Sequence, residues 1–257
     1  MKKIKKIIIL ITARTYFQNF FEFLHFIALK GMNYGSANEP KDSGENNLLK
    51  MMAKELPINA VIFDVGSNNG QYLELLLQNF NALQPTIHCF EPDDTAFAKL
   101  QKNFKNNKNV ILNNFALGDQ NMKSILFSDG LGDVKASLVD VESDNLIEKE
   151  IEIKRLDDYC IANKIDKINF LKIDTEGYEA NVLIGSEKMI QSNCIERIQL
   201  EHGSMQTIIM GTTLYSLKKL LPRFNIFHIK QNGITKILYK PQMEIFYNSN
   251  YYFKLKN

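Results

Sequence analysis

The stretch VIFDVGSNNG, residues 61–70, decides the fold class of this chain. An apolar run ends at Asp64 and breaks into a turn that contains Gly66 and Gly70, after which QYLELLLQNF has the pattern of a helix. Such a turn brings bare backbone close to a ligand at the N-terminus of the helix. The turn lacks the three glycines of the dinucleotide fingerprint, and the preceding acid suits a zwitterionic amino-acid ligand better than a pyrophosphate. Asp64 can hold a water molecule or an ammonium group.

A second acid, Glu91, ends the next apolar run in the segment HCFEP. A carboxylate at the end of the strand that follows the glycine turn can accept hydrogen bonds from both hydroxyls of a ribose. The sequence therefore predicts a nucleotide-type cofactor site. Its candidate residues in these two segments are Asp64, Gly66, Ser67, Asn68, Gly70, Glu91 and Pro92.

From Asn47 onward, apolar runs of strand length alternate with helical patterns. This predicts a Rossmann-like α/β fold with a mostly parallel sheet and helices on both faces. We expect strands at 60–64, 86–91, 110–116, 168–174 and 195–201, and helices near 71–80, 94–106 and 178–190. An insertion at 123–154 alternates like a hairpin around a polar loop, 129–145, and is placed to cover a substrate. The C-terminal segments FNIFHIK, ITKILYK and YYFKLKN are expected to add antiparallel strands.

The sequence resembles the FkbM-type methyltransferases, which use S-adenosylmethionine. The resemblance rests on DVGSNNGQY, CFEP, NNFALGD, RLDDYC and FLKIDTEGYEANVLIG, which occur in the family's order between about residues 58 and 203. Asn68 stands where many enzymes of the wider class carry a second glycine. The resemblance implies a class I methyltransferase domain at 47–257 and S-adenosylmethionine as cofactor. Because Asn114 and Ala116 close the third strand, we expect them to be neighbours of the adenine.

A second polar segment, KIDTEGYE, crowds ionisable side chains where an apolar strand stops; they are Lys172, Asp174, Glu176 and Glu179. Two of them have structural explanations. Lys172 can pair with an acid, and a carboxylate such as Glu179 is favoured by the dipole of a first helical turn. The next strand ends in IQLEHG, so we expect Glu201 and His202 beside Asp174 at the same edge of the sheet.

These residues predict a catalytic edge made of Asp174, Glu176, His202 and Lys172. Methyl transfer to a hydroxyl is a direct displacement on a sulfonium, so the protein must align oxygen, carbon and sulfur and remove the hydroxyl proton. Glu176 or His202 is the candidate base. A second hypothesis assigns Asp174, Glu201 and His202 to a divalent cation, magnesium or manganese, that lowers the pKa of a sugar hydroxyl and leaves Glu176 as base.

Composition limits the partners. The chain has 257 residues, 45% of them hydrophobic, which suits one α/β domain with attachments. The net charge is +2, and residues 1–30 hold six Lys or Arg against one Glu, so the remainder is slightly acidic. A nucleic-acid enzyme usually spreads positive charge over its substrate face, so we expect no nucleic-acid partner. Cys89, Cys160 and Cys194 form no Cys-x-x-Cys pair, which favours a reduced, cytoplasmic protein without structural zinc.

The N-terminal segment MKKIKKIIILITA imitates a signal peptide, but its apolar core is short and charged residues interrupt the apolar pattern after it. Apolar side chains then recur at helical spacing, which predicts an amphipathic helix over 16–29; they are Phe17, Phe20, Phe21, Leu24 and Ile27. We expect this helix to pack on the domain or on a second copy of the chain in a homodimer. Peripheral attachment to the inner face of a membrane is the alternative. A polar linker at 31–44 completes an N-terminal extension of residues 1–46.

Three functional hypotheses stay open. The first is an S-adenosylmethionine-dependent O-methyltransferase acting on a hydroxyl of a sugar in a bacterial surface glycan or its precursor, because the resemblance points to glycan and natural-product tailoring. The second is N- or C-methylation of another small molecule, although the Asn-Pro-Pro-Tyr signature of amino-group methylation is absent. The third is a binding protein that keeps the fold without catalysis.

Overall fold

The computed structural model describes residues 9, 11–35, 43–128, 136–139 and 146–256, and its centre is a sheet in the order β10-β9-β11-β8-β7-β1-β2-β3. The strands from β8 to β3 run parallel to one another. They are β1 (Val61–Val65), β2 (Thr86–Phe90), β3 (Val110–Asn113), β7 (Phe170–Ile173) and β8 (Arg197–His202). The predicted C-terminal antiparallel strands are confirmed as β9 (Phe224–Lys230), β10 (Gly233–Ile237) and β11 (Ser249–Leu255).

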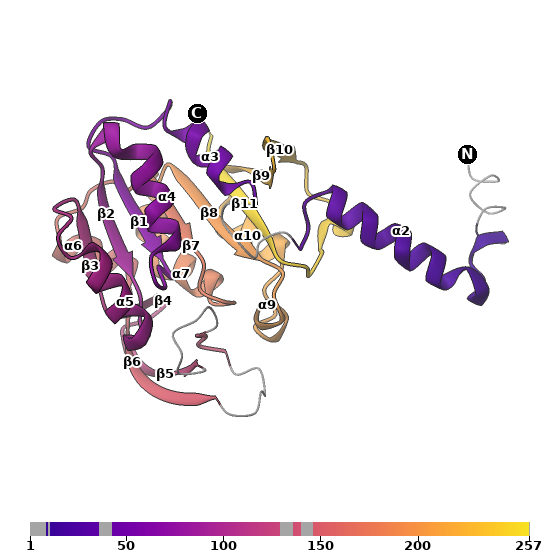
Figure 1. Ribbon diagram of the computed structural model, residues 1–257, viewed down its shortest axis with the longest axis horizontal. Coiled ribbons are helices and arrows are strands. Elements are labelled where there is room, and N and C mark those ends of the chain that lie inside the picture. Colours follow the sequence, from indigo (N-terminus) through magenta and orange to yellow (C-terminus); the bar gives the residue numbers. More distant parts are fainter. Residues whose placement is uncertain (1–8, 10, 36–42, 129–135, 140–145, 257) are drawn as a thin grey trace.

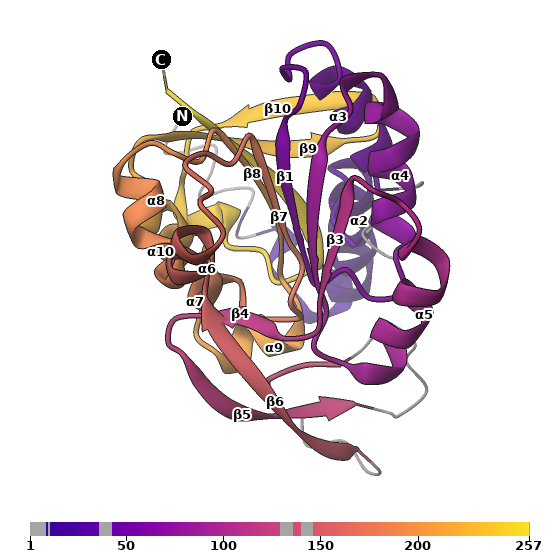
Figure 2. The same cartoon turned by 90° about the vertical axis from the view of Figure 1, so that its left-hand side faces the viewer.

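Helices cover both faces of this sheet, as Figure 2 shows. One layer contains α3 (Glu45–Met52), α4 (Gln71–Phe80) and α5 (Asp94–Phe104). The other contains α6 (Leu156–Ala162), α7 (Glu179–Gly185), α8 (Glu187–Gln191) and α10 (Leu214–Leu220). A short helix, α9 (Met205–Ile209), follows β8, and short 3-10 turns lie at Asn81–Leu83 and Pro241–Met243. The predicted Rossmann-like class is therefore confirmed.

The apolar spacing of α4 explains how this layer is attached. Leu73, Leu76 and Phe80 are fully buried in a cluster that includes Ile62 of β1 and Ile87 of β2. Burying a side chain of this kind stabilises a fold by about 1.5–3 kcal/mol. The packing fixes α4 directly behind the glycine turn from which it starts.

The predicted insertion supplies two strands of a second, smaller sheet in the order β4-β6-β5 at one end of the domain (Figure 2). Its strands are β4 (Ala116–Gly118), β5 (Met122–Ser128) and β6 (Ile147–Arg155). β5 and β6 pair antiparallel, which confirms the hairpin. Of the polar loop at 129–145, residues 136–139 are described, and the remainder lies outside the described ranges.

Two predicted elements are divided in the structure. The strand expected at 110–116 ends at Asn113, because the amides of Asn113 and Asn114 donate to the carbonyl oxygens of Cys89 and Glu91, each at 3.0 Å, and turn the chain out of the sheet. The helix expected at 178–190 is interrupted at Ser186 and continues as α8.

The N-terminal helix α2 (Gln18–Gly31) follows a 3-10 turn at Thr15–Phe17 and projects from the domain, as Figure 1 shows. The helix itself was predicted correctly. α2 has no buried residue, so its apolar face is not packed on the domain, and packing on a second copy of the chain stays a prediction. No helix in the described part of the chain combines the length and apolar content needed to cross a bilayer.

The segment after α2 is more than a separating linker. Asn33 and Tyr34 are buried, and the Asn33 amide donates to the carbonyl oxygen of Ile229 at 3.0 Å. Part of the predicted linker at 31–44 therefore packs on the domain. Residues 36–42 lie outside the described ranges.

Candidate active site

The glycine turn is built so that two strand ends can touch. Gly66 has φ 79°, and a Cβ there would overlap the carbonyl oxygen of Asp174 after β7. Gly70 has φ 96° at the N-cap of α4, where a Cβ would collide with the ring of Phe104. Positive φ is a conformation that glycine adopts without steric cost. Both glycines therefore hold the turn against the rest of the site.

Glu91 connects this turn to the end of β2. Its carboxylate accepts from the backbone N–H of Asn68 and of Asp93, each at 2.8 Å. Burial raises the pKa of Glu91 to about 7. Two carboxylate oxygens offer about four lone-pair directions, so acceptor capacity remains for ribose hydroxyls.

The other predicted cofactor residues surround these two. The Ser67 hydroxyl donates to the carbonyl oxygen of Asp64 at 2.8 Å, and both carboxylate oxygens of Asp64 are buried without a donor among the described residues. Pro92 is half-buried, and the Asn114 amide donates to the Glu91 carbonyl. Ala116 does not close the third strand as predicted, because it lies in β4 of the smaller sheet.

Strand register brings polar side chains from different strands into rows. Asp64 of β1 pairs with Lys172 of β7, and Lys172 pairs with Gln199 of β8. Side chains alternate between the faces of a sheet with a period of two, so Asp174 and Glu201 continue the same face one step further along. The catalytic edge predicted from strand ends is thus one face of three neighbouring strands.

Lys172 is the buried cation of this face. Its Nζ lies 2.9 Å from Asp174 Oδ2, 3.9 Å from Asp64 Oδ1 and 4.8 Å from the centre of the Tyr72 ring. Burial lowers the pKa of Lys172, but the surrounding carboxylates outweigh it and raise the pKa overall. Lys172 therefore stays charged and pairs with the acids, as its structural explanation predicts, and its catalytic role stays a prediction.

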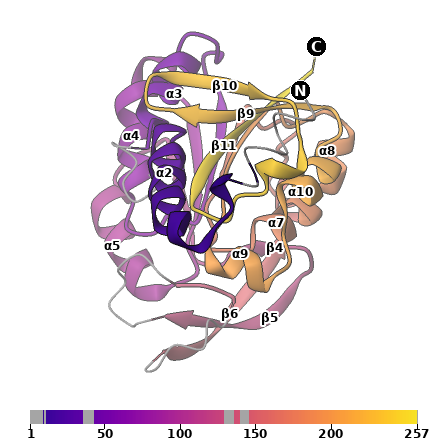
Figure 3. The same cartoon turned by 90° about the vertical axis from the view of Figure 1, so that its right-hand side faces the viewer.

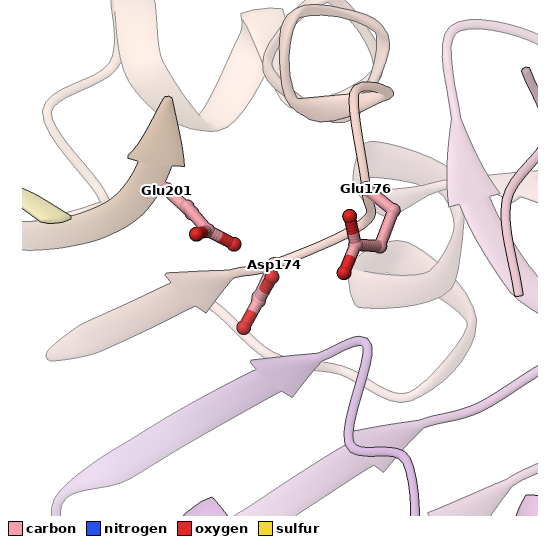
Figure 4. Close-up of side chains that lie close together, drawn as sticks. All are labelled: Asp174, Glu176 and Glu201. Carbon is pink, nitrogen blue, oxygen red and sulfur yellow. The ribbon is translucent and has the colours of Figure 1, made fainter. Parts of the chain in front are cut away.

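Asp174, Glu176 and Glu201 converge at the carboxyl edge of the sheet, as Figure 4 shows. Each offers a carboxylate oxygen, and these oxygens lie within 4.8 Å of one another. Burial favours a raised pKa for Asp174, but Lys172 reverses this and lowers it. Burial and then Asp174 hold the pKa of Glu201 well above its usual range. The two neighbouring carboxyls are therefore shifted in opposite directions, which favours the ionised form of Asp174 and the protonated form of Glu201.

Glu176 sits on a turn shaped by its neighbours. It has φ 50°, and its carbonyl oxygen accepts from the Ser137 hydroxyl of the insertion at 2.8 Å. Glu179 Oε1 accepts from the backbone N–H of Thr175 at 3.0 Å and of Gly177 at 3.1 Å. The structural role considered for Glu179 is thus confirmed, since it folds the loop that presents Glu176. The contact from Ser137 brings the insertion to the catalytic edge.

His202 does not join this cluster, which corrects its prediction as base and metal ligand. It follows Glu201 in β8, so its side chain points to the opposite face of the sheet. Its ring packs against Phe246 and Tyr251, with centroids 5.7 and 6.2 Å away. Burial lowers the pKa of His202 to about 4, so it is neutral. The oxygen cluster that can hold a cation consists of Asp174, Glu176 and Glu201 instead.

The geometry agrees with what the sequence matches. Residues 64–212, more than half of the chain, match the methyltransferase FkbM domain. The chain belongs to the FkbM methyltransferase family. This places it among enzymes, and its fold is that of the class I S-adenosylmethionine-dependent methyltransferases.

Known proteins similar to this FkbM methyltransferase include the 2-O-methyltransferase NoeI of Sinorhizobium fredii, 26% identical over 182 residues that cover 65% of this chain and 72% of NoeI. The crystal structure of methyltransferase FkbM from Methylobacillus flagellatus superposes with a TM-score of 0.50 at 15% identity. That match covers 77% of this chain and 44% of the other, so this chain spans less than half of that structure. An S-adenosylmethionine-dependent O-methyltransferase from Thermotoga maritima matches at 10% identity and a TM-score of 0.40, over 83% of this chain and 65% of that one.

Several FkbM motif residues have structural roles here. Asp157, in RLDDYC, accepts from the backbone N–H of Lys188 at 3.0 Å and of Met189 at 3.1 Å, which starts α8. Asp119, in NNFALGD, accepts from the Tyr178 hydroxyl at 3.2 Å and the Asn181 amide at 3.1 Å.

Sequence reasoning missed a buried polar chain beside Lys172. The Tyr72 hydroxyl donates to Gln199 Oε1 at 2.7 Å, and Gln199 Nε2 donates to the buried Glu45 of α3. Gln199 precedes Glu201 by two residues, a spacing that identifies the same face of the strand. Glu45 carried no such signal.

Proposed function

We propose that this FkbM methyltransferase uses S-adenosylmethionine to methylate a hydroxyl of a sugar in a bacterial surface glycan or its precursor. The observation that carries the proposal is the meeting of two half-sites, where the glycine turn of β1 touches the backbone of Asp174 at the end of β7. One half offers Glu91 to a ribose, and the other offers a carboxylate cluster to an acceptor. The name of NoeI, a 2-O-methyltransferase, supports oxygen as the methylated atom.

The cofactor half suits a sulfonium amino acid joined to a nucleoside. The buried oxygens of Asp64, which lack a donor among the described residues, are acceptors for a water molecule or an ammonium group. Glu91 stands at the end of the neighbouring strand with lone pairs left for two hydroxyls. S-adenosylmethionine carries both an ammonium group and a ribose.

The acceptor half suits removal of a proton from a hydroxyl. The acceptor oxygen attacks the methyl carbon, the sulfonium leaves as a neutral thioether, and the hydroxyl proton passes to Glu176. Burial and the neighbouring Asp174 raise the pKa of Glu201, which favours the protonated form that can donate a hydrogen bond to a second oxygen of the acceptor, while Lys172 holds Asp174. A positioned base contributes roughly 10²- to 10⁴-fold to such a reaction.

A cation is the second candidate device at this edge. Three carboxylates are hard oxygen donors, and Asp174, Glu176 and Glu201 are close enough to bind one magnesium or manganese ion. A bound cation would lower the pKa of a hydroxyl beside it. Chelation with EDTA distinguishes a mechanism that uses the Glu176 base alone from one that needs a cation. An enzyme without a metal requirement keeps its turnover in EDTA, whereas a metal enzyme loses turnover and regains it with added magnesium or manganese.

Mass spectrometry of surface glycans tests the function itself. In cells that lack the gene, one sugar of the surface glycan should be 14 mass units lighter, and the wild-type gene should restore its mass. A gene that encodes Glu176→Gln should fail to restore it at a similar protein level. A methyl group lost from nitrogen or carbon of another small molecule, with unchanged glycans, would favour the alternative of N- or C-methylation.

A further inference from the structure

Helix α2 carries an apolar face that lies in solvent. Phe20, Leu24 and Ile27 follow one another at helical spacing and are 55%, 42% and 49% exposed. Polar residues repeat the same spacing on the opposite side of the helix; they are Gln18, Glu22 and His25. Figure 3 looks onto this helix and shows it standing in front of the domain. Phe21, Phe23 and Phe26 are 41%, 60% and 51% exposed as well, and Leu29 is half-buried against the core. α2 is thus an aromatic-rich helix with a narrow polar side, and most of its apolar side chains are exposed.

The base of α2 is fixed to the catalytic edge of the large sheet. The Asn33 amide donates to the carbonyl oxygen of Ile229 near the end of β9, and the Ser249 hydroxyl donates to the Asn33 carbonyl oxygen at 3.3 Å. Ser249 pairs with His202 at the end of β8, the strand that carries Glu201. Asn33 is therefore bonded directly beside the end of a catalytic strand.

Further contacts fix the helix at this base. Lys30 Nζ donates to the carbonyl oxygen of Gly35 at 2.6 Å and lies 4.8 Å from the centre of the Tyr247 ring. Tyr34 is buried in the core. The backbone of Tyr247 packs against Gly203, which follows β8. A surface that binds α2 is therefore held close to the acceptor edge.

The charge of the N-terminal residues indicates which kind of surface binds α2. Residues 1–30 hold six Lys or Arg against one Glu, and four of the lysines precede the helix. Like charges repel, so a second copy of this basic segment is a poor partner for it, whereas anionic lipid headgroups attract it. The fourteen residues of α2 span about 21 Å, less than the roughly 30 Å of a bilayer core, so the helix suits the interface.

We infer that α2 docks in the interface of an anionic membrane and holds the carboxyl edge of β8 beside the lipid surface, where it serves a membrane-attached acceptor. The docking rests on α2, on its base and on the basic charge of residues 1–30 in the sequence. The membrane-attached acceptor rests in addition on the proposed function.

Vesicle flotation tests the docking. Wild-type protein should float with vesicles of phosphatidylethanolamine and phosphatidylglycerol, three parts to one, and should not float with pure phosphatidylcholine. The double variant Phe20→Ser, Ile27→Ser should bind the anionic vesicles at least about tenfold more weakly. The matched control, Gln18→Ser with His25→Ser, has the same spacing on the polar side and should bind like wild type. Absent wild-type binding, or equal binding by both double variants, overturns the inference. So does loss of a dimer in the apolar variant with unchanged vesicle binding, since a second copy would then cover α2.

Fluorescence quenching tests the orientation. A dye on Met205→Cys reports from α9, after β8, and a dye on Asp166→Cys reports from the segment before β7, at the opposite edge. Both carry Cys194→Ser, because Cys194 is only half-buried and could take up the dye, whereas Cys89 and Cys160 are buried. Quenchers on lipid headgroups should reduce the Met205→Cys signal at least threefold more than the control, and equal quenching would overturn the orientation. Calorimetry of S-adenosylmethionine on the same proteins reports separately on the proposed function, whose failure leaves the flotation result unaffected.

Discussion

Lys172→Met should remove a large part of the folding free energy, because Lys172 is the cation between Asp64 and Asp174. At an effective dielectric constant of about 20, unit charges about 3 Å apart attract by roughly 5–6 kcal/mol before desolvation is subtracted. Removing one partner of a buried pair costs about 3–5 kcal/mol in practice. Domains are stable by about 5–15 kcal/mol, so a loss of this size should be easy to measure.

Equilibrium unfolding in urea at about pH 8 and about pH 5.5 measures this loss. The control is Lys167→Met, since Lys167 pairs with Glu196 at the surface and should contribute no more than about 1 kcal/mol. Without Lys172, the pKa values of Asp64 and Asp174 rise in the folded state, which then binds more protons than the unfolded chain as pH falls. The deficit should therefore shrink at the lower pH. The reasoning would be refuted if both variants lost the same free energy of unfolding, or if the loss in Lys172→Met did not change with pH.

Three further predictions concern the cofactor turn and the far face of the sheet. Glu91→Ala should weaken S-adenosylmethionine binding at least about tenfold by calorimetry. At pH values below about 7 the wild-type protein should also bind more weakly, because the ligand favours the ionised Glu91 carboxylate, whose pKa is about 7. Gly66→Ala should lower the unfolding midpoint far more than Gly211→Ala, which has a similar φ of 64° but open space around it. His202→Phe keeps the aromatic packing and should leave turnover near wild type; a 10²-fold loss would return His202 to the mechanism.

The elements that matched prediction are those where local and global signals agree. The helix 71–80 was predicted with its observed bounds, because Gly70 marks its start and its apolar residues recur at helical spacing. In the structure Gly70 has φ 96° and the apolar residues face the sheet. The strand 110–116 was too long because its apolar pattern continues while Asn113 and Asn114 bond back to the neighbouring strand. A pattern of apolar residues carries no information about where a side-chain amide will find its acceptor.

The sequence predicts which edge of the sheet carries the candidate site, but not all of the side-chain contacts within it. Strand ends predict that Asp174 and Glu201 lie together, whereas the alternation of side chains along β8 places His202 on the opposite face from Glu201. The partnership of Lys172 with Asp64 depends on strand order, which places β1 beside β7. Ser137 reaches Glu176 from an insertion, a contact that only the folded chain defines.

Glu176→Gln tests the central claim most directly. The acceptor is surface glycan from cells that lack the gene, and the donor is S-adenosylmethionine with a tritiated methyl group. The control is Glu187→Gln, at an exposed position of α8. Glu176→Gln should bind S-adenosylmethionine as wild type does and retain its thermal stability, while methyl transfer falls by about 10² or more and the control stays active. Near-normal transfer by Glu176→Gln would contradict the account and place the base elsewhere.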